Sequence, residues 1–213
     1  FMDSKQKPNF LIIMSDEHGP MFSSTYGHKI VETPNMDRLA KSGVTFDAAY
    51  CNSPLCVPSR LSFLTGRHPN RIKAWDNATV LPADELTWPY ALRSLGYEVV
   101  LSGKMHLLDH LHGFQRQLEP TLGGDNQKGV GAFTPWRHTM PSNVVPPWSG
   151  VPEAGAGSSQ IIDHDEKVHV AAVKYLENEV NTSNPFALCV GYLAPHFPYK
   201  VPEPYFSHYY PNN

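Results

Sequence analysis

Three apolar runs along the chain each end in a cluster of polar residues, and this pattern constrains the fold more than any other feature. The runs span residues 9–14, 97–101 and 186–193. Continuous apolar runs are typical of strands that are buried on both faces of a parallel sheet. Segments with helical patterns separate the runs along the sequence. The alternation predicts an α/β fold with a mostly parallel sheet flanked by helices.

Two shorter helices are expected from their start and end signals. The first follows Thr33, a candidate capping residue, has Pro34 in its first turn and ends at Gly43. A short strand is expected directly after it, at 44–46. The second helix is expected at 87–95; Pro89 lies in its first turn and Gly96 follows its last residue.

The longest helix is expected at 163–180. Its apolar residues stand four apart, which places them on one stripe of a helix; they are Val168, Ala172, Leu176 and Val180. A stripe of this kind is expected to pack against the sheet.

The composition argues against several classes of protein. The chain has 213 residues, a formal net charge of −3 and no cluster of lysines and arginines, so no nucleic-acid partner is expected. No apolar stretch approaches the roughly 18 residues of a membrane-spanning helix, so no membrane partner is expected. The 3 cysteines are an odd number, which argues against a disulfide framework.

The first residues lack the apolar core of a signal peptide, which favours a cytoplasmic location. A periplasmic or secreted protein whose leader had been removed would have the same sequence. Residues 115–160 break the alternation with glycine- and proline-rich sequence, and this stretch is too long for an ordinary connection. We interpret it as a functional excursion. Trp136 and Trp148 within it either wall a ligand pocket or anchor the loop.

The polar clusters that follow the three apolar runs contain groups suited to chemistry. Asp16 and Glu17 follow the first run, Lys104 and His106 the second, and His196 the third. In open α/β sheets, ligands bind outside the carboxyl ends of the strands. These side chains are therefore expected at one edge of the sheet. The alternative is that loops are simply polar.

The segment Cys56–Arg67 reads as a loop that enters a short helix, with Pro58 in the first turn and Gly66 past the end. Cys56 would then lie at a helix N-terminus, where free N–H groups and the helix dipole favour negative charge. Arg60 and Arg67 add forked donors suited to oxyanions. The residues alone indicate a reactive cysteine in an anion site, with a buried free thiol as the alternative.

The same segment matches the pattern C-x-P-S-R-x-x-x-L-T-G-R at every fixed position, and in this it resembles the sulfatase family. Further segments resemble the family in the expected order; they are Ser15–Glu17, Thr33–Leu39, Gly103–His106 and Pro195–Pro198. The resemblance covers nearly the whole chain apart from the excursion. It implies the alkaline-phosphatase-like α/β fold, and Ser102–His106 resembles the choline-sulfatase-like branch without fixing a substrate.

By this resemblance, Cys56 is the precursor of formylglycine, which a maturation enzyme makes by oxidising the cysteine. One hydroxyl of the hydrated aldehyde attacks sulfur, the alcohol leaves, and the second hydroxyl then loses its proton and expels sulfate. A divalent metal offsets the repulsion between the anionic ester and the nucleophile. Asp16, Glu17 and the group derived from Cys56 would bind it, and oxygen ligands favour Ca²⁺, with Mg²⁺ or Mn²⁺ as alternatives. Relatives often have Asp, Asn or Gln at the position of Glu17, which could instead be a solvated carboxylate.

The resemblance also implies roles for four further residues. Arg60 would fix the formylglycine and steady the metal carboxylates, and Lys104 would contact sulfate and the nucleophile. His106 would take the proton of the hydrate, and it is expected to face the same way as Lys104, two residues before it in an extended segment. His196 would contact sulfate and protonate the leaving oxygen. The alternative for His196 is a loop histidine packed between prolines.

In this family, further metal ligands and a second lysine come from a downstream segment. The resemblance therefore implies that residues 1–213 are the N-terminal part of a sulfatase catalytic domain whose downstream half lies in another segment or a second chain. The end of the chain, from Tyr205 to Pro211, is expected to be a loop. The expected activity is hydrolysis of a small-molecule or saccharide sulfate monoester. A phosphonate or phosphate ester hydrolase of the same superfamily and an inactive fragment or pseudoenzyme with a binding role remain as alternatives.

Overall fold

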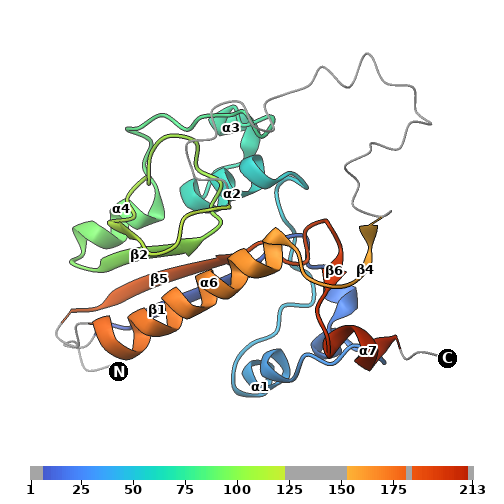
Figure 1. The fold of residues 1–213 in the computed structure, drawn as a ribbon. Coiled ribbons are helices and arrows are strands. Elements are labelled where there is room, and N and C mark those ends of the chain that lie inside the picture. Colours follow the sequence, from blue (N-terminus) through green and yellow to red (C-terminus); the bar gives the residue numbers. More distant parts are fainter. Residues whose placement is uncertain (1–6, 123–152, 181–183, 211–213) are drawn as a thin grey trace, which may run out of the picture.

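A four-stranded parallel sheet forms the centre of the protein, with strand order β1-β5-β2-β3. The computed structural model describes residues 7–122, 153–180 and 184–210 (Figure 1). The four strands are β1 (Phe10–Ser15), β2 (Glu98–Gly103), β3 (Arg116–Gln117) and β5 (Phe186–Tyr192). A second, parallel pair is formed by β4 (Gly155–Ala156) and β6 (Lys200–Val201). The predicted mostly parallel α/β fold is confirmed.

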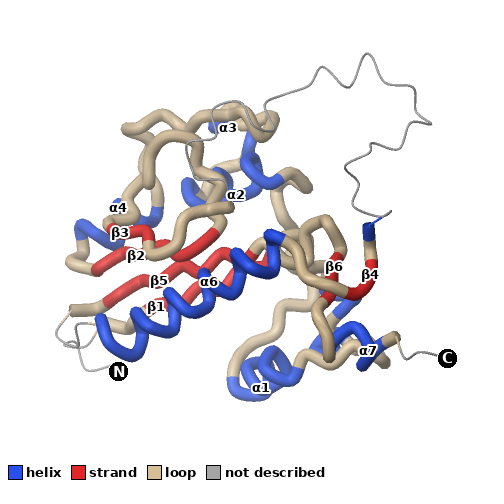
Figure 2. Tube along the Cα trace, viewed as in Figure 1, coloured by secondary structure: helices blue, strands red, loops and turns tan. Residues whose placement is uncertain are grey.

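Helices lie on both sides of this sheet, as Figure 2 shows by colour. The helices are α1 (Pro34–Ser42), α2 (Cys56–Thr65), α3 (Pro69–Ile72), α4 (Trp88–Ser94), α6 (Gln160–Lys174) and α7 (Tyr205–Tyr209). Two 3₁₀ turns, η1 (Pro20–Phe22) and η2 (Ser24–Tyr26), follow β1, and one π-helical turn, η4 (Tyr175–Glu179), extends α6. None of the described helices has the length and apolar character needed to cross a bilayer.

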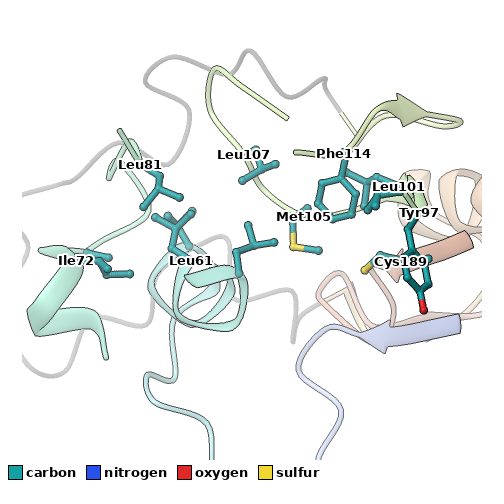
Figure 3. Packing of buried hydrophobic residues seen from close by; sticks show 14 residues of the cluster. Leu61, Ile72, Leu81, Tyr97, Leu101, Met105, Leu107, Phe114 and Cys189 are labelled. Atoms are coloured by element: carbon teal, nitrogen blue, oxygen red, sulfur yellow. The ribbon is translucent and has the colours of Figure 1, made fainter. Parts of the chain in front are cut away.

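Side chains of β2 and β5 pack into two separate hydrophobic cores, one on each face of the sheet, because successive side chains of a strand point to opposite faces. Val99, Leu101 and Cys189 pack with Leu61 and Leu64 of α2 on one face, and Figure 3 shows part of this cluster. The other face packs beneath α6 in a second cluster, whose buried members are Val100, Val168, Ala172, Tyr175, Phe186, Leu188 and Val190. Both central strands are therefore buried on both faces, as predicted.

The first strand departs from that prediction. Leu11 and Ile13 of β1 are 50% and 60% exposed, and only Ile12 and Met14 pack against the core on the α2 side. The reason is position: β1 is the outermost strand of the described sheet, and α6 covers β2 and β5 instead. The apolar run correctly predicted a strand but not burial on both faces.

The long helix begins three residues earlier than predicted, at Gln160, and its last turn is π-helical. Tyr175 lies seven residues after Val168 and three after Ala172, so ordinary helical spacing places it on the same stripe, and it is fully buried. The predicted stripe residue Leu176 is one position further round the helix and is 37% exposed. Val168 and Ala172 are buried as predicted.

Three smaller predictions, at Thr33, at residues 44–46 and at the end of the chain, are wrong. Residues 44–46 form no strand, and Val44 and Phe46 are largely exposed. Thr33 does precede α1, but its side chain does not cap the helix, because its hydroxyl bonds to that of Ser23 at 2.9 Å. The segment expected to be a terminal loop contains α7. Within the excursion, residues 123–152, including Trp136 and Trp148, lie outside the described residues.

The strands are in register, so their carboxyl ends meet at one edge of the sheet. Ser15 at the end of β1 pairs with Tyr192 of β5, and Gly191 pairs with Gly103 of β2. The chain segments that leave these three strands carry the predicted polar clusters. The sheet thus brings together residues that are far apart in the sequence, as expected.

Candidate active site

A buried carboxylate and two buried cations form the centre of the site. Asp16 follows β1 and is 7% exposed, while Arg60 of α2 and Lys104 after β2 are 4% and 3% exposed. Arg60 Nη2 donates to Asp16 Oδ1 at 3.2 Å, and Lys104 Nζ donates to Asp16 Oδ2. Arg60 Nη1 also donates to the Lys104 carbonyl oxygen at 2.7 Å. Each buried charge therefore has a partner of opposite sign, as burial requires.

Burial alone would raise the pKa of the Asp16 carboxyl. The positive charges of Lys104 and Arg60, with the hydrogen bonds that they donate, outweigh that effect and hold the pKa of Asp16 below its usual value. Asp16 is therefore an anion at neutral pH. An anionic carboxylate is the kind of ligand that hard cations take.

Cys56 is the first residue of α2 and lies half-buried beside this centre. Its Sγ atom lies 3.7 Å from Lys104 Nζ and 4.0 Å from Asp16 Oδ2. Val57 and Leu61 fix the helix in the core behind it. The predicted position of the cysteine at a helix N-terminus is confirmed.

His106 is held in an unusual backbone conformation, with φ of 60°. The expectation of an extended segment from Lys104 to His106 is therefore wrong, since β2 ends at Gly103 and the chain turns. Both residues nevertheless line the same cavity of about 180 Å³, together with His196. The His106 Nδ1 atom is buried and has no hydrogen-bond partner among the described residues.

His196 follows β5 and lines this cavity. Its Nδ1 atom is 2.8 Å from the Phe197 carbonyl oxygen, so Nδ1 carries the proton in that hydrogen bond. Its Nε2 atom is 3.7 Å from Glu17 Oε1. Glu17 is exposed and has a φ of 59°.

Three side chains of the site lie close enough together to hold a metal ion. Ligand atoms of Asp16, Cys56 and His196 lie within 4.8 Å of one another, whereas Glu17, which the sequence predicts as a ligand, is outside this group. Hard cations such as Ca²⁺ take six to eight oxygen ligands, more than the carboxylates of Asp16 and Glu17 supply. The anionic Asp16 fits such an ion, and further oxygens have to come from other groups.

One predicted anion-binding residue lies elsewhere. Arg67 donates from Nη1 to Glu85 Oε1 at 2.5 Å, and its other guanidinium nitrogen reaches the Arg71 carbonyl oxygen at 3.3 Å. It ties α2 to α3 and to the following loop rather than facing the cavity. The pattern that contains Arg67 gives no information about which of its arginines points inward.

Sequence reasoning missed a residue that stabilises the start of α2. Asn77 Oδ1 accepts the backbone N–H of Val57 at 3.0 Å, and no side chain caps the helix from the residue before Cys56. Asn77 lies 20 residues downstream of Val57, outside any local capping pattern. An Asn in a turn-rich loop is too common for the sequence to single it out.

The low pKa of His106 predicts a particular pH dependence of stability. Burial, with the charges of Lys104 and Arg60, lowers the pKa of His106 from 6.5 to about 4. Between these values the unfolded chain binds a proton that the folded protein does not, so the free energy of unfolding falls on acidification from pH 6.5 to about 4. Urea unfolding of His106→Gln over this range is expected to show a smaller fall. The exposed His110→Gln is the control, and equal pH dependence in wild type and His106→Gln would contradict the prediction.

Comparisons with known proteins bear on the whole described region. A family model for sulfatases matches residues 8–212. A choline-sulfatase of Rhizobium meliloti is 32% identical over 95% of this chain and 41% of its own length. A solved structure of a protein in complex with its substrate D-glucosamine-2-N,6-O-disulfate is 27% identical, with a TM-score of 0.64 over 90% of this chain and 35% of that one.

The fold is also shared more widely. A phosphonate monoester hydrolase of Agrobacterium radiobacter has a TM-score of 0.69 at 22% identity, over 95% of this chain and 44% of its own. In each of these three comparisons the chain spans less than half the length of its relative.

Proposed function

The chain belongs to the sulfatase family, and on that premise we propose that the protein hydrolyses sulfate monoesters with Cys56 as the precursor of its nucleophile. The observation that carries the proposal is the position of Cys56. Its Sγ atom lies 3.7 Å from the buried Lys104 ammonium, at the helix N-terminus beside Asp16. The Lys104 ammonium and the positive end of the α2 dipole converge where an anionic ester has to bind.

Formylglycine formed from Cys56 by a maturation enzyme supplies a hydrated aldehyde with two hydroxyl groups. The residues around it have separate tasks. Lys104 faces both the sulfur position and Asp16, so its ammonium can stabilise negative charge on the nucleophile and on a sulfate oxygen. Arg60 holds Asp16 and the backbone carbonyl of Lys104 and thereby fixes both groups.

The two histidines suit opposite directions of proton transfer. His106 has a pKa lowered to about 4 and is neutral at pH 7, so it can accept the proton of a hydroxyl group. His196 has Nδ1 bonded to a backbone carbonyl, so its Nε2 can give a proton to a leaving oxygen when the ring carries a proton on both nitrogens. Both line the same cavity.

A divalent cation fits the anionic side of the site. Asp16 and Glu17, with the group derived from Cys56, would hold Ca²⁺, or alternatively Mg²⁺ or Mn²⁺. When bound, such an ion polarises a sulfate oxygen and offsets the repulsion between an anionic ester and its nucleophile. Glu17 Oε1 lies 3.7 Å from His196 Nε2, so in this role Glu17 would exchange its contact with His196 for the ion.

The alcohol part of the ester would occupy the remainder of the cavity. Its walls beyond the three polar residues are mostly apolar, formed by Leu107, Leu108, Leu122, Ile161, Leu193 and Phe197. A volume of about 180 Å³ holds a sulfate group and a small part of an alcohol. A small-molecule sulfate ester or the sulfated end of a saccharide meets this description.

Paired assays test the proposal. The protein, produced together with a formylglycine-generating enzyme and supplied with Ca²⁺, is expected to hydrolyse an aryl sulfate faster than the matching aryl phosphonate. Faster phosphonate hydrolysis would make it a phosphonate hydrolase of the same fold. No turnover of either ester even when the downstream half of the domain is supplied, in protein whose Cys56 remains a thiol, would identify an inactive protein with a binding role.

A further inference from the structure

Two buried ionisable side chains on α6 take no part in the chemistry proposed above. Asp165 is 9% exposed and His164 is 4% exposed. They face the segments that leave β3 and β5, at the end of the sheet where the cavity lies. Buried charged groups are retained only where specific partners stabilise them.

Asp165 binds the backbone that leads to His196. Its Oδ1 atom accepts the N–H of Leu193 at 2.8 Å, and its Oδ2 atom accepts the N–H of Ala194 at 2.7 Å. These are the first two residues after β5, and His196 follows two residues later. Each carboxylate oxygen thus fixes one peptide of the segment that presents the histidine.

His164 extends this connection to the other wall of the cavity. Its Nε2 atom lies 2.8 Å from the Pro120 carbonyl oxygen, and its Nδ1 atom lies 3.2 Å from Asp165 Oδ1. Both nitrogens face acceptors, which is the arrangement of a doubly protonated, positively charged ring. Burial would lower the pKa of His164, but the hydrogen bonds to Asp165 and Pro120 and the negative charges of Asp165 and Glu119 raise it.

Three chain segments therefore meet at this pair: α6 itself, the segment after β3 and the segment after β5. Thr121 and Leu122, next to Pro120, line the cavity, as do Leu193 and His196. A hydrogen-bonded carboxylate between them fixes their separation more rigidly than apolar packing does, because both its oxygens have defined directions.

We propose that Asp165 and His164 are positioning residues that hold His196 and the 120–122 wall of the cavity in place for proton transfer to the leaving alcohol. The catalytic meaning of this proposal rests on the proposed function. Displacements of about 1 Å at a positioning contact can lower a rate about 100-fold. The pair would act through His196, without touching the reacting atoms.

The test exploits the dependence of proton donation on the leaving group. An alkyl sulfate releases a strongly basic alkoxide and needs the proton, whereas 4-nitrophenyl sulfate releases a weakly basic phenolate and needs it little. Asp165→Asn keeps the size of the side chain but places an N–H₂ group against backbone N–H donors. We expect it to lower kcat for the alkyl sulfate at least about 10-fold more than for 4-nitrophenyl sulfate.

Matched variants separate positioning from general destabilisation. Glu166→Gln changes an exposed carboxylate on the same helix and is expected to leave both rates unchanged. His164→Gln keeps a donor toward the Pro120 carbonyl. It is expected to lower kcat for the alkyl sulfate more than for 4-nitrophenyl sulfate, by a smaller factor than Asp165→Asn. It replaces Asp165→Asn in the test if that variant does not fold. A loss of the same size for both esters would overturn the proposal, because a smaller folded fraction lowers all rates alike.

A second readout does not depend on turnover. The ¹⁵N and ¹³C signals of the His196 ring, assigned with His196→Gln, are expected to shift or broaden in Asp165→Asn and to stay unchanged in Glu166→Gln. Unchanged His196 signals in Asp165→Asn would overturn the proposal even in an active enzyme. If the wild-type protein hydrolyses no ester, the proposed function fails, and these signals alone decide whether the pair positions His196.

Discussion

Replacing Cys56 with alanine is expected to abolish aryl sulfate turnover and to leave the fold intact. The variant removes the atom that formylglycine formation requires, and losses on removing a nucleophile reach about 10⁴-fold or more. The Cys56 side chain is half-buried at the first position of α2, while Val57, Leu61 and Leu64 supply the packing. The free energy of unfolding is therefore expected to change by less than about 1 kcal/mol. Rates and urea unfolding of the same preparation measure both quantities.

Cys51→Ala is the matched control, because Cys51 is an exposed cysteine five residues earlier on the same loop. It is expected to keep both activity and stability. Mass spectrometry of the peptide that contains position 56 is expected to find formylglycine in active wild-type protein. Full activity with an intact thiol in every preparation would rule out the proposed nucleophile, and loss of folding in Cys56→Ala would identify a structural thiol.

Replacing Gly191 with alanine is expected to disrupt the site from within the sheet. Gly191 of β5 lies against the backbone of Lys104, and the Lys104 N–H donates to the Gly191 carbonyl oxygen at 2.7 Å. A Cβ atom at Gly191 would overlap the carbonyl oxygen and carbon of Lys104, which are backbone atoms with no freedom to rotate away. Overpacking of this kind costs about 3 kcal/mol.

The effect would extend to chemistry because that same carbonyl oxygen accepts Arg60 Nη1 at 2.7 Å. Shifting Lys104 moves its ammonium from Asp16 and Cys56, and we expect a loss of at least about 100-fold in kcat for an aryl sulfate. Thermal unfolding and initial rates measure the two effects. Gly19→Ala is the control, since a Cβ there meets only the side chains of Met21 and Phe22 at ordinary contact distances. A Gly191→Ala protein as stable as Gly19→Ala would contradict the overlap.

The sequence could predict those site residues that directly follow a strand. Asp16, Lys104 and His196 each follow an apolar run, and parallel strands in register bring such positions to one edge whatever the loops do. Cys56 could be placed at a helix start because Pro58 and Gly66 mark the helix locally. These are short-range signals combined with one rule of sheet topology.

The remaining features depend on contacts between distant segments. Arg67 and Arg60 share one short pattern, yet Glu85 draws Arg67 outward while Asp16 draws Arg60 inward. Asp165 reads from the sequence as one more polar residue of a helix, and only the path of the chain after β5 gives its carboxylate two N–H partners. The exposure of β1 likewise depends on where α6 packs, and the hydrophobic periodicity of a sequence does not reveal which strands a helix covers.

The outer strand has a practical consequence for work with this polypeptide. One side of the β1 backbone has no strand beside it in the described sheet, and Leu11 and Ile13 present an aliphatic surface next to that edge. An edge of this composition is a template on which a neighbouring molecule can add a strand. Self-association through this edge would compete with unfolding, so the melting temperature is expected to depend on protein concentration and is best measured over a dilution series. Placing a lysine at position 13 would be the simplest way to keep such samples monomeric.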